Sequence, residues 1–133
     1  MLLDAMIINL KSEIPELNFT VNKDKHTIII PPKHEGFGSI EVLDDIEEFT
    51  IFIGDFTHWH CECYDQDLTA QEQAESAASE VTAFLLDLFQ DKIIVWGDSN
   101  GGGGFYKKDE RRGAKKYRGK LRKEWLWSGP ISS

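Results

Sequence analysis

The chain has 133 residues, of which 41% are hydrophobic and 11% aromatic, enough for a single domain with its own core. It contains no run of about 18 apolar residues, so we expect no membrane-spanning helix. The net charge is −8 but unevenly placed: residues 1–100 hold 20 Asp and Glu against 5 Lys and Arg, whereas residues 101–133 hold 3 against 10. An acidic body of this kind repels nucleic acid and associates rapidly with basic partners.

The N-terminal residues MLLDAMIINLKSEIPEL have neither a basic leader nor a small-residue cleavage site, so we expect no secretory signal. The two cysteines, Cys61 and Cys63, are then expected to be reduced thiols in the cytoplasm. In a strand their Cα atoms would lie about 6.6 Å apart, near the upper limit for a disulfide. We therefore predict a cytoplasmic protein without a disulfide.

The first half of the chain is predicted to be a helix followed by an antiparallel meander. Apolar residues recur at helical spacing up to Ile14, and Pro15 then ends that helix. Runs of β-type residues follow it, separated by turn-forming residues and by the KHEGFG loop at 33–38. The predicted elements are a helix at 2–14 and strands at 18–21, 26–30, 39–43, 49–53 and 56–64.

The second half is predicted to be a long helix followed by two strands. Thr69 and Glu72 form a capping-box pattern, and an apolar stripe then continues for about five turns to Phe89. Strands are expected at 92–96 and 121–127, with a flexible glycine-rich and basic excursion at about 98–120 between them. The fold class is therefore α+β, a two-layer sandwich with a mainly antiparallel sheet in the order α-ββ-βββ-α-ββ.

The segment THWHCECYD, residues 57–65, has the most unusual composition in the chain. Side chains alternate along a strand, so His58 and His60 are expected on one face and Trp59, Cys61 and Cys63 on the other. This geometry argues against one zinc ion bound by two histidines and two cysteines, and against a Cys–His catalytic pair within the strand.

The turn before this strand predicts which residues face each other. If Gly54-Asp55 is a two-residue turn, Ile51 opposes His58 and Thr50 opposes Trp59. Both faces of the hairpin would then carry apolar groups, so the strand is either covered on both faces or covered once and used as an interface.

Two other function classes remain open from the residues. His58 and His60, joined by His34 from the loop, could bind a metal in a metal-binding protein or a metal-dependent enzyme. The basic segment 107–123 contains ten Lys and Arg, with Tyr106 directly before it and Tyr117 within it, a composition typical of nucleic-acid contacts. In a third interpretation, this segment neutralises the acidic body of the same chain.

The phrases HEGFGSIEV and FIGDFTHWHCECYD, together with the size, acidity and α+β layout, resemble bacterial immunity proteins of contact-dependent inhibition and related polymorphic toxin systems. The resemblance implies a stoichiometric inhibitor whose acidic surface covers a basic, nuclease-type toxin, with no reaction and no cofactor of its own. It assigns no role to a residue by position. From charge and from the preference of interfaces for Trp, we predict that the toxin is bound by Glu41, Asp44, Asp45, Glu47, Glu48, Trp59, Asp65 and Asp67.

Overall fold

The structure is a computed structural model that describes residues 2–46, 48–62, 65–98, 102–110 and 122–131. The predicted class, α+β with mainly antiparallel strands, is confirmed, as is the order of helices and strands. The helices are α1 (Leu2–Glu13) and α2 (Ala70–Phe89), with short 3-10 helices η1 (Glu35–Phe37) and η2 (Lys108–Glu110). The strands are β1 (Thr20–Asn22), β2 (Thr27–Ile30), β3 (Ile40–Asp44), β4 (Phe49–Ile53), β5 (Thr57–Cys61), β6 (Ile93–Asp98), β7 (Gly103–Lys107), β8 (Arg122–Leu126) and β9 (Gly129–Pro130).

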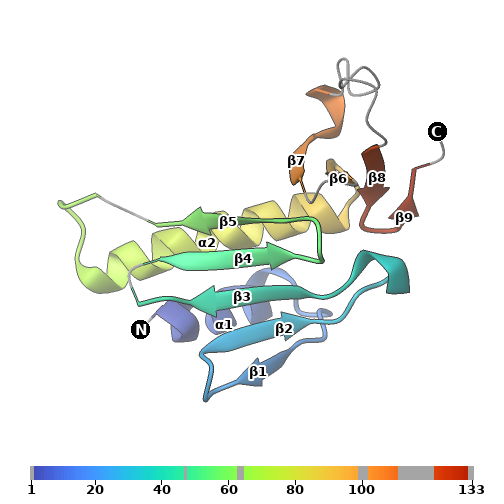
Figure 1. The fold of residues 1–133 in the computed structure, drawn as a ribbon. Coiled ribbons are helices and arrows are strands. Elements are labelled where there is room, and N and C mark those ends of the chain that lie inside the picture. The colour runs from blue at the N-terminus through green and yellow to red at the C-terminus, as the bar shows by residue number, and fades with distance from the viewer. Residues whose placement is uncertain (1, 47, 63–64, 99–101, 111–121, 132–133) are drawn as a thin grey trace.

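The strands form two antiparallel sheets. The first is a meander in which β1 to β5 follow one another in chain order, so β1 and β5 are its edge strands. The second has the order β7-β6-β8-β9 and lies at one end of the first (Figure 1). The strands after α2 therefore build a sheet of their own instead of extending the meander.

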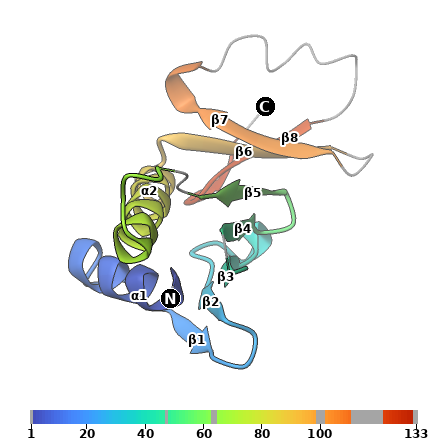
Figure 2. The same cartoon turned by 90° about the vertical axis from the view of Figure 1, so that its left-hand side faces the viewer.

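Both helices lie on the same face of the five-stranded sheet (Figure 2). The predicted stripe of α2 is confirmed, because its side chains are buried at Ala74, Ala77, Ala78, Val81, Leu85 and Leu88. They pack with Met6 and Leu10 of α1 and with the alternate inward residues of the strands. The opposite face of the sheet carries the other residues of each strand, among them Phe52, whose exposed fraction is 37%. No helix in the described ranges is both long and apolar enough to cross a membrane.

The predicted capping box of α2 is confirmed. The Thr69 hydroxyl accepts a hydrogen bond from the Glu72 amide at 3.1 Å, and the Thr69 amide donates to the Glu72 carboxylate at 3.0 Å. The pKa of Glu72 is lowered, first by the hydrogen bond that its carboxylate accepts from the Thr69 amide and then by one from the Thr69 side chain, because both favour the ionised form. The cap fixes where α2 begins and hence which of its side chains face β5.

The predicted register of the β4–β5 hairpin is wrong by one residue. Phe56 belongs to the turn, where its amide donates to the Ile53 carbonyl at 3.1 Å, so Gly54 to Phe56 form a three-residue connection. Gly54 has φ +53°, and a Cβ there would lie 2.0 Å from the Phe37 carbonyl oxygen, so this corner requires glycine. As a result Trp59 opposes Ile51 on the inward face, and His58 opposes Phe52 on the outward face.

The second sheet includes part of the region predicted to be a flexible excursion. Residues 103–107 form β7, which pairs with β6 in register from Ile93 opposite Lys107 to Gly97 opposite Gly103. Residues 99–101 and 111–121 of that predicted excursion lie outside the described residues. Phe37 packs on Trp127 and Phe56 on Trp125, with ring centroids 5.1 and 5.9 Å apart. These aromatic contacts join the second sheet to the turns at the end of the first.

Candidate functional site

The two faces of β5 have different surroundings, as the alternation predicts. His58 and His60 are exposed on the outward face, whereas Cys61 is buried and Trp59 half-buried toward α2. The Cys61 thiol donates toward the Ala77 carbonyl and the Glu80 carboxylate. Cys63 lies outside the described residues, and the prediction that both thiols are reduced stays a prediction.

The three histidines of the metal hypothesis do not gather into one site. His60 Nδ1 lies 3.0 Å from the Thr50 hydroxyl and 3.2 Å from the Glu48 carboxylate. His58 is its neighbour on the same face, with ring centroids 5.5 Å apart. His34 instead precedes η1, where its Nδ1 accepts from the Gly36 amide and its ring packs on Trp125. Within the described residues, no three His, Cys, Asp or Glu side chains are placed to hold one metal ion.

The acidic residues predicted to bind a partner are divided among several places. Glu41 lies on the outward face of the sheet, where it is exposed and opposite Phe52. The Glu48 carboxylate lies beside His60 on the same face. Asp45 is exposed in the β3–β4 turn, and Glu47 lies outside the described residues. Asp65 and Asp67 are exposed in the loop before α2, where the Asp65 carboxylate accepts from the Asp67 amide at 3.0 Å. These carboxylates do not form one patch with Trp59.

Asp44 has a structural role that the sequence prediction missed. Its carboxylate is 8% exposed and accepts hydrogen bonds from the Leu3 amide at 3.1 Å and from the Ile46 amide at 2.9 Å. Leu3 belongs to the first turn of α1, where amides lack a partner within the helix and a negative charge is favourable. Asp44 therefore joins the start of α1 to the β3–β4 turn.

Replacing Asp44 with alanine should destabilise the fold by about 2–3 kcal/mol. The Leu3 and Ile46 amides would lose their acceptor, and the Leu3 amide lies in the first turn of α1. Urea unfolding measured by circular dichroism gives this free energy. Asp45→Ala is the matched control, since that side chain is exposed in the same turn; it should change stability by less than about 0.5 kcal/mol. Equal losses in the two variants would contradict the assigned role.

Trp59 forms part of an aromatic groove whose lining residues come mainly from β5, α2 and β7. Its ring packs on Phe84 of α2 with centroids 5.0 Å apart, and Phe84 packs on Phe105 of β7 at 5.0 Å. Trp59 and Phe105 are 6.3 Å apart. The groove has a volume of about 570 Å³ and is also lined by Glu80, Asp87, Ile93, Tyr106, Lys107 and Glu110.

Negative groups predominate around this groove. Glu80, Asp87 and Glu110 supply three carboxylates, against the single ammonium of Lys107. The Tyr106 hydroxyl donates to the carboxylate of Glu124 on β8, whose pKa is raised because its burial disfavours the charged form. The Trp59 Nε1 atom is buried and has no hydrogen-bond partner. The arrangement is suited to binding a group that is both flat and cationic.

The sequence prediction found Trp59 but not the residues that accompany it. Phe84 falls within the apolar stripe predicted for the long helix, and Phe105 falls within the predicted excursion. The available signal was the spacing of Glu80, Phe84 and Asp87, which places two acids and one aromatic ring on the same helical face. Nothing in the local sequence indicates that Phe105 would reach them.

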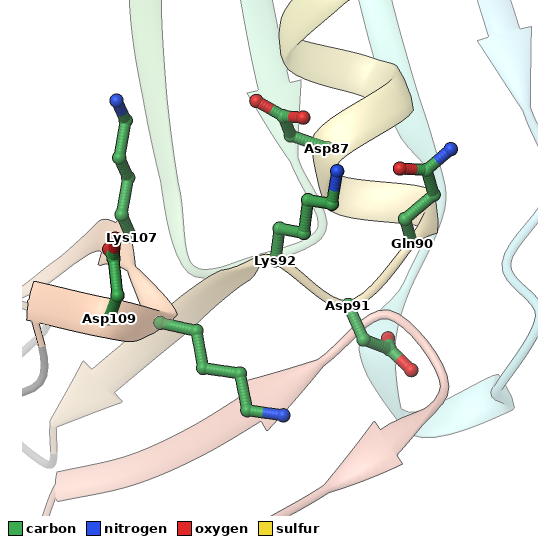
Figure 3. A pocket seen from close by; sticks show the side chains of 7 residues that line it. Asp87, Gln90, Asp91, Lys92, Lys107 and Asp109 are labelled. Carbon is green, nitrogen blue, oxygen red and sulfur yellow. The ribbon is translucent and has the colours of Figure 1, made fainter.

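A second pocket of about 520 Å³ lies beside the groove and is lined by charges of both signs (Figure 3). Lys92, which directly precedes β6, extends toward Asp87, whereas Lys107 extends away from both. The remaining lining residues are Gln90, Asp91, Lys108 and Asp109. The lysines do not converge, and aspartates lie among them, so this pocket offers no concentrated charge to an anion.

Of the basic segment 107–123, the residues at 111–121 lie outside the described ranges, and the nucleic-acid hypothesis remains untested.

Comparison with protein-family models, with curated proteins and with solved structures found no match to this chain.

Proposed function

We propose that this protein is a stoichiometric inhibitor of a cationic protein, specifically an immunity protein that neutralises a basic, nuclease-type toxin domain in the bacterial cytoplasm. The observation that supports this function is the groove formed by Trp59, Phe84 and Phe105 with carboxylates around it. It combines the aromatic surface that protein interfaces favour with the charge that a basic partner requires.

The position of the groove supports protein binding over small-molecule chemistry. It opens beside β5, which is an edge strand of the five-stranded sheet, and it draws residues from α2 and from both sheets. Phe105 is 36% exposed although it packs on Phe84, so apolar surface remains open to a partner. Exposed aromatic surface surrounded by polar groups is typical of a protein-binding site.

The charge distribution supports the role of an inhibitor. An inhibitor of a lethal enzyme must capture its target quickly, and an excess of carboxylates raises the rate of encounter with a basic surface. Residues 1–100 carry that excess and supply five of the nine residues that line the groove, whereas β7 and η2 supply the other four. The same carboxylates resemble phosphate in charge and would compete for the nucleic-acid site of a nuclease.

The test is co-expression with the protein encoded by the adjacent gene. We expect rescue of growth, a one-to-one complex by size-exclusion chromatography, and an association rate that falls as salt is raised. Trp59→Ala should weaken the complex by about 30-fold, the effect of a 2 kcal/mol interface residue. Phe52→Ala, which truncates an exposed ring on the opposite face of the sheet, is the matched control and should leave the affinity within about threefold. Unchanged toxicity on co-expression would reject the function.

A further inference from the structure

The base of the groove is an aromatic surface with its rings steeply inclined to one another. The plane of Phe84 stands at 60° to that of Trp59 and at 66° to that of Phe105. Rings inclined in this way present some faces as well as some edges to the groove. The face of an aromatic ring is electrostatically negative. A cation placed over a Trp or Phe face is attracted by this charge distribution, and the attraction increases when water is excluded.

The carboxylates lie on two sides of this surface. Glu80 and Asp87 are seven residues apart in α2, two helical turns, so both lie on the face that carries Phe84. Glu110 lies in η2, immediately after β7. Among the described residues, neither Glu80, Asp87 nor Glu110 forms an ion pair, although Lys107 lines the groove and Lys92 extends toward Asp87.

We propose that the groove binds the side chain of an arginine from the partner protein. This inference rests on the proposed function and specifies the residue that the partner supplies. A guanidinium is flat, delocalised and weakly hydrated, so it can lie on an aromatic ring while its N–H groups donate to a carboxylate. The ammonium of lysine is compact and strongly hydrated, and it gains less from the aromatic surface.

Other ligand classes fit this groove less well. An anion would be repelled by three carboxylates, and only Lys107 would attract it. A purely apolar side chain would remove water from Glu80 and Asp87 without offering them a donor, which is costly. A group that is flat, cationic and rich in donors satisfies both the rings and the carboxylates.

The test uses the full-length chain labelled with ¹⁵N and a blocked Gly-Gly-Arg-Gly-Gly peptide. The four tryptophan indole signals are followed by NMR, and Trp59→Phe identifies the signal of Trp59. We expect a saturable shift of that signal with a dissociation constant in the millimolar range. The lysine peptide should bind at least fivefold more weakly, and the citrulline peptide, which keeps the shape without the charge, should cause no saturable shift.

Variants of the groove test separately the contact of arginine with the aromatic rings and its contact with the carboxylates. Phe105→Leu keeps the apolar volume but removes a ring, and should weaken binding of the arginine peptide about fivefold. Glu80→Gln combined with Asp87→Asn should weaken it about tenfold. Glu75→Gln is the matched control on α2, because this exposed carboxylate lies outside the groove; it should leave binding unchanged.

Three results would overturn the assignment: equal binding of the citrulline peptide, equal binding of the lysine peptide, or shifts at Trp96, Trp125 and Trp127 without one at Trp59. Tighter binding of the peptide to an Arg111→Gln, Arg112→Gln variant would also overturn it, because the chain's own arginines would then occupy the groove. If arginine fails but Trp59→Ala still weakens the toxin complex, the proposed function stands and this inference falls. If the arginine peptide binds but no complex forms with the protein encoded by the adjacent gene, the arginine site stands and the proposed function falls.

Discussion

Replacing Gly103 with alanine should separate the second sheet from the first and lower the melting temperature by about 10 °C. A Cβ at this position would lie 1.7 Å from the carbonyl oxygen of Phe56 and 3.1 Å from that of Trp96. Both obstacles are backbone atoms, so rotation of a side chain cannot relieve the clash. The cost should be about 3 kcal/mol or more, which for a domain of this size corresponds to the expected shift.

Gly104→Ala is the matched control for this substitution. It introduces the same methyl group one residue later in β7, where the nearest atoms, at 3.0–3.1 Å, belong to the indole of Trp96. That ring can shift, so the loss should be about 1 kcal/mol. Because β7 carries Phe105, Gly103→Ala should also weaken the toxin complex, whereas Gly104→Ala should affect it little. Thermal unfolding and binding are measured on both variants, and equal melting temperatures would contradict the role assigned to Gly103.

The elements that were predicted correctly are those whose signals are local. The capping box at Thr69 and the alanine-rich stripe of α2 depend on residues within a few turns, and the structure confirms both. The alternation of His58 and Trp59 likewise follows from strand geometry alone. The hairpin register failed because the turn includes Phe56, whose placement depends on its contacts with Phe37 and Trp125 in distant segments.

The candidate site could be predicted only in part, because its residues come from four separate segments. Trp59 could be singled out as an aromatic residue between two histidines, but its neighbours could not. Phe105 follows four consecutive glycines, a sequence that favours flexible chain, and only pairing with β6 makes it a strand. Asp44 is the opposite case. Its position in an acidic run predicts a surface carboxylate, whereas in the structure it is buried and accepts a hydrogen bond from the Leu3 amide, which is distant in sequence.

Neutralising the carboxylates of the groove should weaken the toxin complex by about 30-fold. The variant combines Glu80→Gln, Asp87→Asn and Glu110→Gln, which keep the shapes of the side chains and remove three negative charges beside Trp59. Three charge contacts of up to about 1 kcal/mol each, only partly additive, give a loss of about 2 kcal/mol. The fold should stay within about 1 kcal/mol of its original stability, because Gln and Asn keep the shapes of the side chains and an amide oxygen can still accept from the Cys61 thiol. Affinity is measured by calorimetry at two salt concentrations, and its salt dependence should become shallower.

The control for this variant removes the same charge elsewhere, through Glu13→Gln, Glu16→Gln and Glu75→Gln, all exposed and outside the groove. Long-range steering depends on net charge, so both triple variants should associate more slowly by a similar, modest factor. Only the groove variant should also dissociate faster, because in the proposed complex only those carboxylates contact the partner directly. Equal dissociation rates in the two variants would show that net acidity alone attracts the partner, and the groove would then lose its role as the binding site.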